Sequence, residues 1–225
     1  KQVVAKEHED LGFDGRFGAG LPAINDGSLL FLQHMVSKMH PYREGDDDAV
    51  GSKIAVVFNG SPLFSGAAES GPSNIRRWII ENDWLDAVVA LPDQLFYNTG
   101  IYTYVWLVTN RKPKERCGTV QLIDGTRFFQ KMEKSLNNKR NKITEAQIRH
   151  LTRIYGSYCD GETAEVVVDE KTGETETRVV SRIFENREFG FLKVTVERPL
   201  RMNFAATEER IARLSEEEEL AAIRP

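Results

Sequence analysis

The chain has 225 residues, of which 40% are hydrophobic and 28% charged, with 17 Gly and 8 Pro. This composition supplies one real hydrophobic core and excludes a collagen-like, Pro-rich or wholly disordered chain. Two cysteines, Cys117 and Cys159, are too few for a disulfide framework and, with only four histidines, predict no structural metal site. No apolar run approaches the ~20 residues of a membrane span and no signal peptide is visible, so we expect a cytoplasmic protein. The chain opens with Lys1 and not with Met, so we expect it to be a piece of something longer.

The net charge of −4 conceals a basic middle segment. Residues 111–153 carry 12 basic and 4 acidic side chains, whereas residues 1–110 carry 8 basic and 14 acidic ones. Such a block attracts the phosphate backbone of a nucleic acid if enough of its side chains share one face; a solvated helical face is the simpler alternative. The candidates for backbone contact are Arg111, Lys112, Lys114, Arg116, Lys139, Arg140 and Lys142.

The first half of the chain alternates helices and strands. Residues 1–27 are polar and Gly-rich, which predicts a loop, and the glycine spacing fits neither a dinucleotide fingerprint nor a P-loop. Apolar residues at spacings of three and four then predict a helix over 28–39, which Pro41 ends. Further along, we expect strands at 54–58, 85–91 and 101–108 and a helix at 73–81.

The order strand, helix, strand predicts a parallel α/β unit. Residues 54–58 form a short continuous apolar run, which indicates a strand buried on both faces, and residues 85–91 predict a second buried strand. The loop 93–100 is too short for a crossover helix, so the third strand must run antiparallel to the second. Ligands of such sheets bind beyond the carboxyl ends of the parallel strands, an edge that the loops 59–71 and 93–100 reach.

The second half has shorter elements. Residues 119–123 predict one more strand, and residues 143–155 predict a helix that Thr144 caps. We expect three further strands at 165–169, 176–182 and 191–196, a turn at 171–173 and a polar helical tail over 208–225.

Three segments resemble type I restriction-modification DNA methyltransferase subunits, a family of N6-adenine methylases. Residues 24–39 resemble the helix that follows the catalytic loop of these proteins. Residues 54–110 resemble the family more strongly, above all in the loop LPDQLFYNTGI at 91–101. Residues 189–200, with the sequence FGFLKVTVERPL, resemble a segment near the C-terminus in one branch of the family.

The resemblance implies an α/β fold, the C-terminal half of a Rossmann-like sheet with one antiparallel hairpin strand and a small β/helical extension. It implies methyl transfer from S-adenosylmethionine to the N6 amino group of adenine in double-stranded DNA, with a specificity subunit and in some systems a nuclease subunit as partners. The expected segments are the remainder of a catalytic domain (1–112), a basic connecting segment with a helix (113–160), a β-meander (161–200) and a polar helical tail (201–225).

The resemblance also implies site residues. Enzymes of this kind flip the target base out of the duplex and stack it on an aromatic ring. The expected target-base pocket comprises Phe96, Tyr97, Thr99 and Gly100, with Phe96 preferred as the stacking ring; its alternative role is to fill hydrophobic space under the hairpin. Asn25 and Asp26 are expected near the cofactor, although a turn and a helix cap explain this pair as well.

Two family features are missing from the sequence. No two prolines are adjacent, so the Asn-Pro-Pro-Phe/Tyr motif is absent, and so is the glycine-rich cofactor loop. We therefore assign no catalytic residue and expect the C-terminal part of a longer methyltransferase, inactive alone and without tight cofactor binding. The alternative is a non-enzymatic module of the same ancestry that binds DNA or a specificity subunit. A third possibility, an unrelated α/β metabolic enzyme, needs a small-molecule pocket built entirely from this chain.

Overall fold

A computed structural model of the chain describes residues 1–169, 172–198 and 207–214. The chain divides into two compact units, residues 1–192 and residues 193–225, which we describe separately. The described part of the second unit contains helix α6 (Glu208–Leu214), while residues 193–198 form neither helix nor strand. The rest of the predicted helical tail, residues 215–225, lies outside the described residues. No helix among the described residues is long and apolar enough to cross a membrane.

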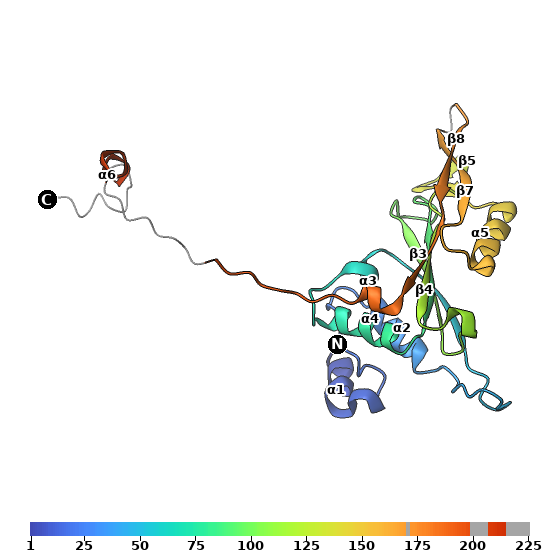
Figure 1. Cartoon of the computed structure of the whole chain (residues 1–225), viewed down its shortest axis with the longest axis horizontal. Coiled ribbons are helices and arrows are strands. Elements are labelled where there is room, and N and C mark those ends of the chain that lie inside the picture. The colour runs from blue at the N-terminus through green and yellow to red at the C-terminus, as the bar shows by residue number, and fades with distance from the viewer. Residues whose placement is uncertain (170–171, 199–206, 215–225) are drawn as a thin grey trace. The chain divides into compact units, whose positions relative to one another are not determined.

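A mixed sheet organises the first unit (Figure 1). Within the described residues its strands lie in the order β1 (Lys53–Phe58), β3 (Thr103–Thr109), β2 (Leu85–Leu91), β4 (Thr119–Asp124) and β9 (Ser181–Glu185). Strands β2 and β4 are parallel, and the other neighbouring pairs are antiparallel. The antiparallel hairpin of β2 and β3 and the short strand β4 are therefore confirmed.

Strand β3 lies between β1 and β2, which the sequence did not predict. Strands β1 and β2 run in the same direction, as expected, but each pairs with β3 and not with the other. The short loop between β2 and β3 requires the two strands to be neighbours, but it does not determine on which edge of β2 the strand β3 lies. On the edge towards β1, β3 pairs with a strand on both of its own edges. Strand β1 is consequently an edge strand of the described sheet, with Val57 47% exposed, so its predicted burial on both faces is wrong.

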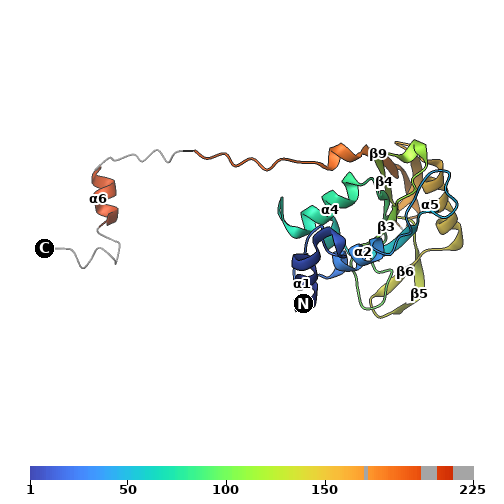
Figure 2. The same ribbon diagram turned by 90° about the horizontal axis from the view of Figure 1, so that it is seen from below.

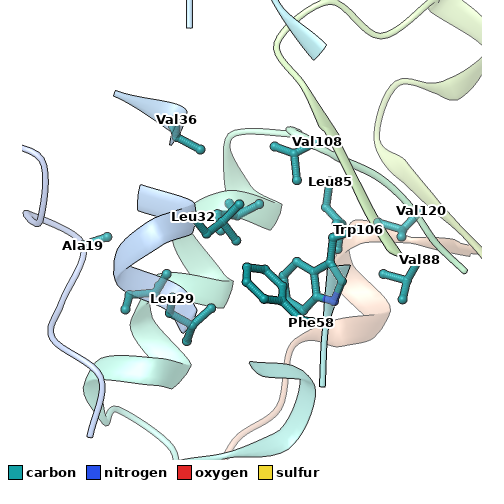
Figure 3. Packing of buried hydrophobic residues seen from close by; sticks show 12 residues of the cluster. Ala19, Leu29, Leu32, Val36, Phe58, Leu85, Val88, Trp106, Val108 and Val120 are labelled. Carbon is teal, nitrogen blue, oxygen red and sulfur yellow. The ribbon is translucent and has the colours of Figure 1, made fainter. Parts of the chain in front are cut away.

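The main hydrophobic core lies between one face of the sheet and helices α2 (Ser28–Val36) and α4 (Gly71–Glu81). Each helix buries a stripe of apolar residues three and four positions apart, which explains why these segments are helical. Leu32 of α2 and Ile75 of α4 are completely buried. In the same cluster, the ring of Trp106 packs edge to face against Phe58 with 5.7 Å between the centroids (Figure 3).

A smaller cluster covers the opposite face of the sheet. Helix α5 (Glu145–Ser157) buries Ile154 there against β4. Its N-terminus forms a capping box: the Gln147 backbone donates to the Thr144 hydroxyl at 3.3 Å, and the Thr144 backbone donates to the Gln147 side chain at 2.9 Å. The predicted cap at Thr144 is thus confirmed.

The region from 161 onward differs from the predicted three-stranded meander. Strands β7 (Thr163–Asp169) and β8 (Glu174–Val179) pair around a turn in which Gly173 has a φ of 70°, a conformation that favours glycine. The chain then enters β9 of the main sheet, so the segment expected at 113–160 and residues 161–192 of the segment expected at 161–200 belong to one compact unit with 1–112. The strand predicted at 191–196 is wrong, because alternating apolar residues do not suffice when β9 already occupies the free edge of β4.

The sequence does not predict two elements that the structure contains. One of these is the hairpin of β5 (Gln130–Leu136) and β6 (Lys139–Lys142), which Figure 2 shows. The hairpin is polar and mostly exposed, so it lacks the apolar alternation of a half-buried strand. Helix α1 (Gln2–Leu11) contains no fully buried residue and lies in the polar, Gly-rich segment 1–27 that predicted a loop. An ion pair between Glu7 and Arg16 and a 2.7 Å hydrogen bond between His8 Nδ1 and the Phe17 carbonyl hold α1 against the following loop.

We expect helix α1 to stay docked on Arg16 at pH 4 and to detach as the pH falls towards 2. Hydrogen bonds from Arg16 lower the pKa of Glu7 from 4.5 to about 2, so the pair stabilises the docked helix above the unfolded pKa, and protonation removes this stabilisation. Amide hydrogen exchange of residues 2–11 across this pH range is the measurement. Glu7→Gln should show the faster exchange already at neutral pH; an unchanged exchange rate in that variant would contradict the prediction.

Candidate nucleic-acid interface

The carboxyl ends of β1 and β2 lie at the same edge of the sheet. In the strand register, Phe58 of β1 lies opposite Tyr104 of β3, and Leu91 of β2 lies opposite Thr103. The loop 59–71, which contains helix α3 (Ser61–Phe64), and the loop 93–100 therefore start at this edge on either side of β3, as the sequence predicts.

The loop 93–100 presents two aromatic rings to solvent. Phe96 is 39% exposed and Tyr97 is 61% exposed. The partial exposure of Phe96 favours the pocket role over its alternative role of filling space under the β2–β3 hairpin. The Ile101 backbone donates to the Thr99 hydroxyl at 3.4 Å, and a Cβ at Gly100 would meet no atom within 4 Å. The packing of the fold does not require glycine at position 100.

Three of the seven candidate backbone-contact residues lie beside this loop, on β6. The Lys139 ammonium lies 5.2 Å from the centroid of the Tyr97 ring. Arg140 and Lys142 are exposed. Among the described residues, none of the three forms an ion pair, so their charges are available to a ligand.

The other four basic candidates follow the opposite end of β3. Arg111 donates from Nη1 to the Val50 carbonyl at 2.8 Å, just before β1, and Lys114 pairs with Glu44 at 3.4 Å. Strand β3 separates the two groups, and a strand of seven residues spans about 20 Å. The seven residues consequently do not share one face, which was the condition for the predicted basic surface.

Two of these four side chains are used inside the protein. The Lys112 side chain is 2% exposed, and its ammonium donates to Asp83 Oδ1 at 2.6 Å and to the Thr119 carbonyl at 2.7 Å. The Arg116 side chain is 7% exposed. The assignment of Lys112 and Arg116 to DNA contact is therefore corrected: sequence alone does not separate a buried, paired cation from an exposed one.

Arg116 is the centre of a buried polar cluster. Its Nε donates to Asp86 Oδ1 at 2.7 Å and its Nη2 donates to Gln121 Oε1 at 2.9 Å. The Tyr155 hydroxyl donates to the second oxygen of Asp86 at 2.5 Å, and burial together with this bond raises the pKa of Tyr155 to about 12. The guanidinium also lies 4.2 Å from the centroid of the Tyr158 ring. This cluster joins β2, β4 and α5 and is structural.

The chain matches a known family over most of its length. The family described as N-6 DNA Methylase matches residues 5–182. The chain belongs to this family. Among curated proteins, the Type I restriction enzyme MjaVII methylase subunit of Methanocaldococcus jannaschii is 31% identical over 117 residues, which are 52% of this chain and 19% of that protein. The HindI methylase subunit of Haemophilus influenzae is 32% identical over 117 residues, 52% of this chain and 24% of that protein.

A solved structure supports the fold of this chain. The type I restriction-modification methyltransferase subunit from Streptococcus thermophilus superimposes with a TM-score of 0.58 at 22% identity, over 82% of this chain and 32% of that one. The chain thus spans about a fifth to a third of the length of the relatives named here.

Of the two residues expected near the cofactor, Asp26 serves the local fold. Asp26 accepts from the Ser61 hydroxyl at 2.5 Å and from the Ser28 backbone at 3.0 Å, and these bonds lower the pKa of its carboxyl. Asn25 is exposed, and the linings of two cavities among the described residues include neither Asn25 nor Asp26. The pair does not by itself fit S-adenosylmethionine, although Asp26 joins the start of α2 to the loop after β1.

The structure adds residues that the sequence did not single out. Asn137 and Asn141 of the β5–β6 hairpin donate hydrogen bonds to Asn98 and Asp93 of the loop 93–100, which we call the aromatic loop. The only available signal was the Asn137-Asn138 pair between polar segments, which is typical of a turn. Within the described ranges, no group of three His, Cys, Asp or Glu side chains could hold a metal ion.

Proposed function

We propose that the chain is part of a site-specific DNA adenine-N6 methyltransferase of a type I restriction-modification system. The family match over residues 5–182 carries this proposal, and the likeness to type I methylase subunits supports it. The whole enzyme would transfer a methyl group from S-adenosylmethionine to the N6 amino group of an adenine flipped out of double-stranded DNA. A specificity subunit would recognise the target sequence, and a nuclease subunit would join the complex in systems that also cleave DNA.

The sheet is proposed to be the C-terminal half of a Rossmann-like methyltransferase sheet. Within the described residues no strand pairs with the outer edge of β1, which leaves its backbone groups available to a further strand. Strands β1, β2 and β4 run in one direction, so a further parallel strand on β1 would continue an α/β sheet. The fold similarity to the Streptococcus thermophilus subunit supports this arrangement.

The target-base pocket is proposed to include Phe96, Tyr97, Thr99 and Gly100. The loop leaves the carboxyl end of β2, the edge at which ligands of α/β sheets bind. Adjacent side chains on an extended segment point to opposite sides, so one of the two rings faces the base. Because Lys139 lies over the ring of Tyr97, Phe96 is the better candidate for the stacking ring.

The methyl-transfer activity is tested in the full-length methyltransferase with its specificity subunit. We expect transfer of radiolabelled methyl groups from S-adenosylmethionine to duplex DNA, and recovery of N6-methyladenine when the product is digested to nucleosides. Recovery of N4-methylcytosine, or absence of methylated product from the assembled complex, would refute the proposed function.

The 225-residue chain alone is expected neither to methylate DNA nor to bind S-adenosylmethionine tightly. The sequence lacks the acceptor motif and the glycine-rich loop, and both carboxylate oxygens of Asp26 already accept hydrogen bonds. Isothermal titration calorimetry with the cofactor is the measurement, and the full-length protein is its positive control. Micromolar affinity of residues 1–225 would show that the cofactor site lies within this chain.

A further inference from the structure

The β5–β6 hairpin is bonded to the start of the aromatic loop. The Asn141 side chain donates from Nδ2 to the Asp93 carbonyl at 3.0 Å, and the residue is 3% exposed. The backbone N–H groups of Arg140 and Asn141 both donate to the Gln94 carbonyl, at 2.9 and 3.1 Å. The strand β6 therefore lies directly against the segment that leads from β2 to Phe96.

A second hydrogen bond joins the tip of the hairpin to the other end of the loop. Asn137 donates from Nδ2 to Asn98 Oδ1 at 2.7 Å. Gln94 and Asn98 have φ angles of 51° and 58°, a left-handed conformation that residues other than glycine adopt when their surroundings hold them there. Both of these residues are bonded to the hairpin, so the hairpin fixes the loop conformation on either side of Phe96 and Tyr97.

The charge of the hairpin is suited to a phosphate backbone. Residues 130–142 contain five basic side chains and one acidic side chain. Alternation along β6 places Lys139 on the same side as Asn141, towards the loop, and Arg140 and Lys142 on the outer side. A cation beside an exposed aromatic ring combines phosphate neutralisation with base stacking, the two interactions by which proteins hold unpaired nucleotides.

We propose that the β5–β6 hairpin is an arm that holds the aromatic loop in position and binds backbone phosphates of duplex DNA on either side of the flipped base. Lys139 contacts the phosphate nearest the loop, and Arg140 and Lys142 contact the flanking backbone. Asn137 and Asn141 are positioning residues, because they act through the loop. This inference rests on the proposed DNA methyltransferase function and assigns the hairpin a role within it.

The charge role is tested by the salt dependence of DNA binding in the full-length methyltransferase with its specificity subunit. The triple variant K139Q/R140Q/K142Q should lower the slope of log affinity against log salt by about 0.9 for each phosphate that it no longer neutralises. The control R77Q/R187Q removes two exposed basic side chains outside the basic segment and should leave the slope unchanged. The proposal is overturned if the slope of the triple variant is unchanged. It is also overturned if the control lowers the slope by as much for each charge removed as the triple variant does.

The positioning role is tested by amide hydrogen exchange. Asn137→Gly keeps the left-handed backbone of Asn137, whose φ is 56°, and removes only its side-chain amide. In this variant and in Asn141→Ala, residues 93–100 should exchange faster than in the parent protein, while β3 should exchange at the parent rate. Asn138→Ala at the same tip is the control. If the Asn141→Ala variant unfolds, the exchange rate of residues 93–100 in Asn137→Gly alone tests the positioning role. An unchanged rate in Asn137→Gly overturns that role.

The two proposals can fail separately. A complex that binds DNA through the hairpin charges but yields no N6-methyladenine refutes the proposed function and leaves the phosphate contacts standing. A complex that methylates adenine with an unaltered salt slope in the triple variant refutes the hairpin proposal alone. Weaker association of the triple variant with the specificity subunit, without a change in salt slope, would make the hairpin a protein interface and also refutes it.

Discussion

Replacing Arg116 with methionine is expected to lower the melting temperature of the chain by roughly 6–20 °C. The substitution leaves the Asp86 carboxylate, 4% exposed, without its buried cation. Breaking a buried ion pair by removing one partner costs about 3–5 kcal/mol, and each kcal/mol lowers the melting temperature of a domain of this size by about 2–4 °C. Differential scanning calorimetry of the 225-residue chain is the measurement.

Arg77→Met is the matched control for this prediction. Arg77 also pairs with a carboxylate, Glu81 at 2.7 Å, but the two side chains are 72% and 59% exposed. An exposed pair of this kind contributes about 0–1 kcal/mol, so the control should melt within a few degrees of the parent protein. The double variant Asp86→Leu/Arg116→Met should recover part of the stability, because it removes both charges. Equal melting temperatures for Arg116→Met and Arg77→Met would show that the Arg116 cluster is not structural.

Phe96→Ala in the full-length methyltransferase is expected to reduce DNA methylation by about 5- to 150-fold without lowering its melting temperature. Stacking of a base on an aromatic side chain is worth ~1–3 kcal/mol, and each 1.4 kcal/mol is a factor of ten. The melting temperature should change little because Phe96 is 39% exposed. Methyl transfer with the specificity subunit present and thermal unfolding are measured on the same preparation.

Two further aromatic variants sharpen the Phe96 test. Tyr42→Ala removes a ring of similar exposure, 46%, that precedes β1 and lies away from the proposed pocket, so methylation should be retained. Tyr97→Ala should have a smaller effect than Phe96→Ala, because the Lys139 ammonium lies over the Tyr97 ring, 5.2 Å from its centroid. If Tyr97→Ala is the more damaging variant, Tyr97 is the stacking ring. If Phe96→Ala lowers activity and melting temperature together, the ring belongs to the core.

The sequence by itself determined those helices and strands in which buried apolar residues recur at a regular spacing. Strand β2 is apolar except for Asp86 and has most of its residues buried, and helix α4 repeats its apolar residues at helical spacing, so local pattern and burial agree. Thr144 was identifiable because a capping box involves residues only three positions apart. The hairpin of β2 and β3 was predicted because the loop 93–100 is too short for a crossover helix. The family resemblance was strongest over residues 54–110, which include this hairpin.

Only the tertiary structure decided how these elements pair and which charges are free. Strand β3 could lie on either side of β2, and pairing with β1, more than forty residues earlier in the chain, settled the order. Arg116 and Lys139 look alike in a basic segment, yet one is buried against Asp86 and the other lies over Tyr97. The β5–β6 hairpin is polar and lacks a predictive pattern, so its position beside the loop 93–100 is known only from its hydrogen bonds to that loop. Contacts between residues distant in the chain carry no periodic signal in the sequence, which is why these features required the fold.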